Sequence, residues 1–224
     1  MSNDVRIGAL VIGSLFWERE RWSRGVVSFN TARDVAAPIR YGRRSESRGL
    51  AYTMILSPGS PNGNAKVVPF QKAASTFAHV IDAASELASA EGLSRSLLSS
   101  SWGCIGLMAV NESSATIVQA WREHMAARAT RVRACYSESP PIDVDGVLAL
   151  DFAPASLDEF DLLLTTVTAP TPPMPTADQV VDAMNSSDAT SNGLRYFREN
   201  VRHGITTFQD ADITSRLRAR NVEI

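Results

Sequence analysis

The order of the apolar segments constrains this chain more than any other feature of its sequence. Apolar and β-branched runs predict strands over much of residues 5–152, whereas amphipathic helical patterns fill the C-terminal part. Strands are expected at residues 5–17, 50–57, 66–70, 102–110, 130–135 and 144–152, and the helices among them at 77–92, 113–126 and 156–164. Because strands and helices do not alternate regularly, the pattern predicts an α+β fold on a curved mixed β-sheet, with flanking helices and a helical C-terminal extension.

A proline-rich segment predicts how the chain is divided. The stretch TAPTPPMPT, residues 168–176, is typical of a connector. We therefore expect an α+β core domain at residues 1–165, followed at 166–224 by the connector and a helical extension that packs on the core. The extension is expected to contain helices around residues 177–184, 194–203 and 210–220. Such helices would suit a homodimer contact or a lid, and the sequence leaves both open.

Composition and charge exclude several classes of protein. The formal charge of −2 and the absence of a recognisable nucleic-acid module argue against nucleic acid as a partner. The apolar run from Ile7 to Trp17 is too short to span a bilayer, which needs about 20 residues, and charged residues follow it instead of a signal cleavage site. We read it as a first core strand of a cytoplasmic protein. Two cysteines and three separated histidines provide neither a disulfide framework nor a set of metal ligands.

Arginine is the one charged residue with an unusual distribution. The chain has twenty arginines and only two lysines, and three of the arginines lie in the segment Arg40 to Ser45. Because the planar guanidinium can hold a carboxylate or phosphate with two parallel hydrogen bonds, Arg40 and Arg43 are candidates for binding a small anionic ligand. The alternative is a solvated loop that pairs with the acidic last third of the chain, with codon usage explaining the excess of arginine.

A short bend after the first strand is the candidate site for chemistry. Backbone N–H groups at Gly13, Ser14 and Leu15 could hold an anion or a developing oxyanion. The spacing fits neither a dinucleotide fingerprint nor a phosphate-binding P-loop nor a nucleophile elbow. A purely structural turn is the other interpretation.

The segment from Ile12 to Trp17, IGSLFW, resembles the N-terminal Y-G-S-[LN] loop of the γ-glutamylcyclotransferase-like superfamily, and is closest to its glutathione-degrading branch. The resemblance implies a barrel-like α+β fold in which this loop binds the γ-glutamyl group of a small-molecule substrate. It also implies a catalytic glutamate and release of 5-oxoproline from a γ-glutamyl amine or peptide. One carboxylate can take the proton from the attacking amine and return it to the leaving amine, so no metal or cofactor is expected.

Glu123 is the residue that the resemblance assigns as the acid/base. It lies in the helix that follows the strand at residues 102–110, as the family glutamate does. The chain departs from the family's Leu-Asp-x-x-Glu-Gly pattern here, because Gln119 and Ala120 replace Leu and Asp and His124 replaces Gly. Ile12 also replaces the aromatic residue before Gly13. Two functions therefore stay open: a γ-glutamylcyclotransferase-like enzyme, or a non-catalytic protein that binds a small anion or a partner.

Overall fold

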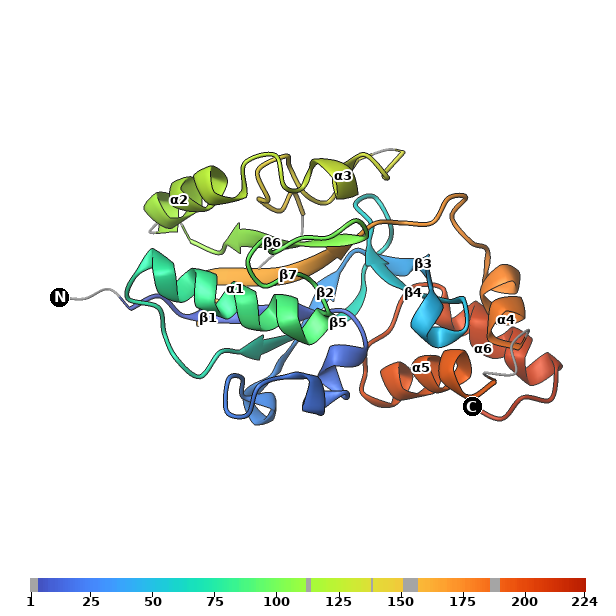
Figure 1. Ribbon diagram of the computed structural model, residues 1–224. Helices are drawn as coiled ribbons and strands as arrows, with labels where there is room; N and C mark the ends of the chain where they lie inside the picture. The colour runs from blue at the N-terminus through green and yellow to red at the C-terminus, as the bar shows by residue number, and fades with distance from the viewer. Residues whose placement is uncertain (1–3, 112–113, 138, 151–156, 186–189) are drawn as a thin grey trace.

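A computed structural model describes residues 4–111, 114–137, 139–150, 157–185 and 190–224. It has two sheets and six α-helices within these ranges, which is an α+β fold (Figure 1). The larger sheet has the order β2-β5-β1-β7-β6, and the smaller is the hairpin β3-β4. The strands are β1 (Ile7–Val11), β2 (Arg33–Ala37), β3 (Ile39–Ser45), β4 (Ala51–Leu56), β5 (Gly63–Pro69), β6 (Gly103–Ala109) and β7 (Leu162–Thr168).

The larger sheet is built around a parallel pair of strands. β1 pairs in parallel with β7, with Ile7 opposite Leu162, and the other neighbours in the sheet are antiparallel. β1 is buried along its whole length and β7 along all but its last residue, as expected for strands covered on both faces. The two sheets do not close into a barrel, so the barrel-like part of the expectation is wrong.

Helix α1 (Phe77–Glu91) crosses the front of the larger sheet in Figure 1 and contacts β7, β6 and β1. Its buried stripe contains Val80, Ala84 and Leu87, which recur at helical spacing. The Thr76 side chain caps the first turn, and Gly92 ends the helix in the left-handed conformation (φ +82°). Helix α2 (Ala115–Met125) packs beside β6 and is followed by the short helix α3 (Thr130–Arg133).

The C-terminal helices pack on the small hairpin. α4 (Ala177–Asn185) and α5 (Thr190–Arg202) both contact β4, and α4 also contacts α6 (Asp210–Ala219). Figure 1 shows these three helices gathered at one end of the molecule, beside β3 and β4. The expected division at residue 165 falls within β7, a strand in the middle of the larger sheet.

Three expected elements differ from the structure. Residues 130–133 form a helical turn in which only Val132 is buried, so the apparent alternation there does not mark a strand. Residues 144–150 contain a turn because the Asp143 carboxylate accepts hydrogen bonds from the N–H groups of Asp145 and Val147; residues 151–152 lie outside the described residues. The helix expected at 156–164 is a turn followed by β7, and Ser156, its expected cap, also lies outside the described residues.

A buried polar cluster joins α6 to β3. The Gln209 side chain accepts a hydrogen bond from the Tyr41 N–H (2.9 Å), and Asp210 Oδ1 accepts one from the Thr207 hydroxyl (2.6 Å). Asp210 Oδ2 and the Tyr41 hydroxyl are buried, and neither has a hydrogen-bond partner among the described residues. Burial raises the pKa of Asp210 to about 6, despite the hydrogen bonds from Thr207.

This raised pKa predicts a pH-dependent effect of Asp210→Asn. A carboxyl group whose pKa is higher in the folded state contributes stability below its ordinary pKa and loses it as the pH rises through about 6. A shift of about two pH units corresponds to about 3 kcal/mol. Between pH 4 and pH 7.5, we expect the free energy of unfolding of the variant to improve relative to the original chain by about 1–3 kcal/mol. Urea unfolding at both pH values measures this, and an equal effect at both would contradict it.

Candidate functional site

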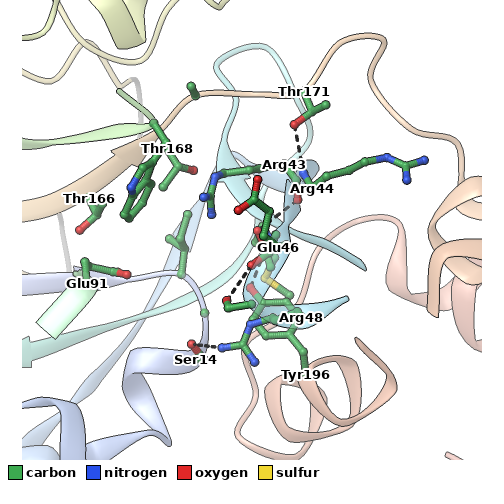
Figure 2. Close-up of a pocket in the computed structure, with 18 of the residues that line it drawn as sticks. Ser14, Arg43, Arg44, Glu46, Arg48, Glu91, Thr166, Thr168, Thr171 and Tyr196 are labelled. Carbon is green, nitrogen blue, oxygen red and sulfur yellow. Dashed lines mark hydrogen bonds between the residues drawn. The ribbon is translucent and has the colours of Figure 1, made fainter. Parts of the chain in front are cut away.

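A cavity of about 650 Å³ opens where the parallel strands β1 and β7 end. In α/β sheets, ligands bind in the crevice beyond the carboxyl ends of such strands. The walls come from the loop after β1, the end of α1, the hairpin β3-β4, β7 with the segment that follows it, and α5. Figure 2 shows the side chains that these elements contribute, among them Ser14, Glu91, Arg43, Thr166, Thr168 and Tyr196.

The loop after β1 is held in place by Tyr196 of α5. A Cβ atom added at Gly13 would lie 2.6 Å from the Tyr196 hydroxyl oxygen, so only glycine lets the two segments approach this closely. Tyr196 is only 3% exposed, and its hydroxyl oxygen accepts a hydrogen bond from the N–H of Met54 in β4 (3.2 Å). Burial raises the pKa of Tyr196, so its hydroxyl keeps its proton and can act as a donor at the cavity wall.

Arg48 holds the same loop from the side of the hairpin. Its guanidinium donates to the Ser14 hydroxyl (2.8 Å) and to the Glu18 carboxylate (2.8 Å), and it lies over the rings of Trp17 and Tyr196. Burial alone would raise the pKa of Glu18, but interactions with Arg48, Ser14 and Arg21 together bring it below its ordinary value. Glu18 is therefore a carboxylate at neutral pH, and it balances the charge of Arg48.

A β-bulge directs Arg43 into the cavity. The register of the hairpin shifts between Tyr41 and Arg43, which leaves Gly42 without a partner residue in β4. A Cβ atom at Gly42 would lie 2.4 Å from Ile55 Cδ1, so a larger residue here would displace the buried Ile55 side chain. Bulges change the direction of the side chains beside them. Arg43 extends into the cavity (Figure 2). Its guanidinium stacks on Trp102, 4.4 Å from the ring centre.

Glu91 is the carboxylate of the cavity. It is the last residue of α1 and lies on the wall opposite Arg43 (Figure 2). Burial raises the pKa of Glu91, although Arg21, Arg43 and the Thr166 hydroxyl act in the opposite direction. The C-terminal end of a helix carries partial negative charge, which also disfavours the carboxylate form. A carboxyl group with a raised pKa is suited to taking up and releasing a proton.

The structure brings together only some of the residues expected from the sequence. Gly13, Ser14 and Arg43 line the cavity. Leu15 is buried beneath the loop, and its carbonyl accepts a hydrogen bond from Trp22 Nε1. Arg40 turns away from the cavity toward the C-terminal segment, where it donates to the Pro175 carbonyl and lies over the Phe208 ring.

Glu123 does not lie at this cavity. It is exposed on α2, where its carboxylate accepts a hydrogen bond from Gln119. Glu91 lines this cavity instead, and it is not among the residues expected from the sequence because it lies at the end of a helix whose clearest pattern is its apolar stripe. A signal for it does exist: Leu87, Glu91 and Gly92 match the Leu-Asp-x-x-Glu-Gly pattern, with Ala88 in the place of Asp.

Comparison with known proteins adds no relative: no protein-family model matches the chain, and neither does any curated protein or solved structure. Within the described ranges, no helix has both the length and the apolar character needed to cross a bilayer. In the same ranges, no three His, Cys, Asp or Glu side chains gather as ligands for a metal ion. The proposed function therefore rests on the residues of the cavity and their arrangement.

The contact between Gly13 and Tyr196 predicts a coupled pair of substitutions. Gly13→Ala places a methyl group against the buried Tyr196 hydroxyl, and overpacking of this kind costs about 1–3 kcal/mol. In a Tyr196→Phe background the oxygen is gone, and we expect the alanine to cost less than about 1 kcal/mol. Thermal unfolding of the two single variants and the double variant gives the coupling energy. Additive effects would show that the two residues do not constrain each other.

Proposed function

We propose that this chain is a γ-glutamylcyclotransferase-like enzyme that releases 5-oxoproline from a γ-glutamyl amine or peptide, with Glu91 as its acid/base. The observation that carries the proposal is that Glu91 shares one cavity with the Gly13–Ser14 loop. A proton acceptor and a set of backbone donors must meet at the same substrate carbonyl for this chemistry.

The reaction follows from these positions. The substrate's α-amine attacks its own γ-carbonyl carbon, and Glu91 takes a proton from that amine. The carbonyl oxygen gains negative charge, which N–H groups of the loop stabilise by about 3 kcal/mol for each good donor. The backbone N–H groups of Gly13 and Ser14, which line the cavity, donate no hydrogen bond to another described residue, so they are available for this. Glu91 then returns the proton to the leaving amine as the carbon–nitrogen bond breaks.

Sequence and electrostatics both support Glu91 in this role. The Leu87-to-Gly92 match belongs to the same family resemblance as the IGSLFW loop, and the two segments meet at one cavity. The raised pKa brings Glu91 closer to neutral pH, where general acid/base catalysis is most effective. Glu123 takes no part in this proposal because it is exposed on α2.

A non-catalytic binding protein is the second candidate. Arg43 favours it, because a stacked arginine that makes no ion pair with a described carboxylate is suited to holding an anionic ligand. The alanine at position 88 and the isoleucine at position 12 depart from the family pattern and favour it too. Such a protein would bind a ligand in the cavity without turning it over.

Glu91→Gln tests the enzymatic function. Removing the acid/base is expected to lower 5-oxoproline release by about 10²–10⁴-fold, because the amide cannot carry the proton. Release is measured by mass spectrometry across a panel of γ-glutamyl amines and glutathione. The matched control is Glu123→Gln, the same change at an exposed site, which we expect to leave turnover unchanged.

Two results would count against the enzyme. Equal turnover by the original chain and Glu91→Gln would remove Glu91 from the mechanism. No 5-oxoproline from any substrate, with a ligand still bound in the cavity, would favour the binding protein.

A further inference from the structure

One arginine of the cavity differs from its neighbours in its partners. Arg43 stacks on Trp102, and no described carboxylate lies within ion-pair distance of its guanidinium. Burial lowers the pKa of Arg43, while the more distant charges of Glu91 and Glu46 partly offset this. Arg43 is thus a half-buried cation with no anion from the described residues in direct contact.

The other arginines of the cavity are already partnered. Arg21 and Arg48 both pair with the Glu18 carboxylate, at 3.0 and 2.8 Å. Arg44 donates to the Tyr52 hydroxyl (3.1 Å) and stacks on the same ring, and its side chain extends away from the cavity in Figure 2. Among these four, Arg43 is the arginine that extends into the cavity without an ion pair to a described carboxylate.

Two hydroxyl groups face the same space and also lack partners. Thr166 and Thr168 are two residues apart on β7 and therefore lie on one face of the strand. Both Oγ1 atoms are buried and neither has a partner at hydrogen-bond distance among the described residues, although the Thr166 hydroxyl interacts with the Glu91 carboxyl. Thr166 is only 5% exposed and lines the cavity. Buried hydroxyl groups normally have a partner, so two unpaired ones beside an unpaired arginine indicate a ligand.

We propose that Arg43, Thr166 and Thr168 form a binding site for the carboxylate of a small monoanionic ligand. Trp102 covers one face of the Arg43 guanidinium and leaves the N–H edge free, which suits the two oxygens of a planar carboxylate. The two threonine hydroxyls supply donors for the remaining lone pairs. Figure 2 shows Arg43 extending toward the wall that carries these threonines.

The charge of the site selects a monoanion. One unpaired arginine balances one negative charge, and a second charge would lie near Glu46 and Glu91, which both interact electrostatically with Arg43. A phosphate dianion is therefore disfavoured. The inference rests on the proposed function in one respect, namely which end of the substrate this site holds. Binding of the carboxylate itself can be measured without turnover.

The test follows the Nε–Hε signals of arginine side chains by NMR on ¹⁵N-labelled protein. The Arg43 signal is assigned as the one missing from Arg43→Gln, and the Arg44 signal by its absence in Arg44→Gln. The ligands are acetate, L-glutamate, 5-oxoproline, the amide of 5-oxoproline, and inorganic phosphate. We expect the carboxylates to shift the Arg43 signal and leave the Arg44 signal in place, and 5-oxoproline to bind at least about tenfold more tightly than its amide.

Calorimetry on the variants separates geometry from net charge. Arg43→Gln and Arg44→Gln remove the same charge, but only the first is expected to weaken 5-oxoproline binding by about tenfold or more and to abolish its preference over the amide. Arg43→Lys keeps the charge without the planar donors and should also lose affinity. Thermal unfolding confirms that each variant is folded.

Several outcomes would overturn the proposal. One is an equal loss of affinity for 5-oxoproline in the Arg43 and Arg44 variants. Another is phosphate binding at least as tight as binding of the carboxylates. A third is no shift of the Arg43 signal with any carboxylate at tens of millimolar. Carboxylate binding without 5-oxoproline production would count against the proposed chemistry and leave this site standing. Turnover that does not depend on Arg43 would count against this carboxylate site and leave the proposed chemistry standing.

Discussion

The site depends on an ionic contact, made by Arg48, that ties the hairpin β3-β4 to the loop after β1 of the larger sheet. Arg48 comes after the hairpin strand β3 in the chain, whereas its hydrogen-bond partners Ser14 and Glu18 come after β1 of the larger sheet. The Arg48 and Glu18 side chains are only 14% and 18% exposed, so removing either would leave a charge in a poorly hydrated place. Tyr196 of α5 packs on the same guanidinium. Hairpin, loop and C-terminal helix are thereby fixed relative to one another, and the cavity lies between them.

The cavity wall also carries polar groups without partners. A fold optimised only for stability would give each of these groups a hydrogen-bond or ion-pair partner. Arg43, Thr166 and Thr168 lack hydrogen-bonded partners among the described residues, while the carboxyl of Glu91 lies where burial disfavours its charge. Each of these arrangements costs free energy of folding. Their concentration on facing walls of one cavity is typical of a ligand site, since a bound molecule supplies the missing partners. The Asp210 and Tyr41 cluster has the same character, but it lies within the contact of α6 with β3.

The sequence predicted the elements with strong local signals and missed those defined by distant partners. The strands β1, β4, β5 and β6 and the helices α1, α2, α4, α5 and α6 lie where apolar runs or periodic stripes place them. β2 and β3 were missed because their arginines and alternating exposure look like a solvated loop. β7 lies where the sequence predicts a helix, because its leucines follow a helix-start pattern and its neighbours β1 and β6 are far away in sequence. Gly13, Ser14 and Arg43 were identified from local motifs, but Glu91 reaches the cavity only through the path of α1.

The late position of β7 in the chain has a consequence for biosynthesis. β1 can pair with β5 as soon as residue 69 has left the ribosome, but the strand that covers its other edge ends at residue 168. Until then the edge of a fully apolar strand, IGALV, stays open while about a hundred further residues are added at 5–20 residues per second. An open apolar edge pairs readily with other chains. For several seconds the nascent chain therefore presents a strand edge whose final partner has not yet been synthesised.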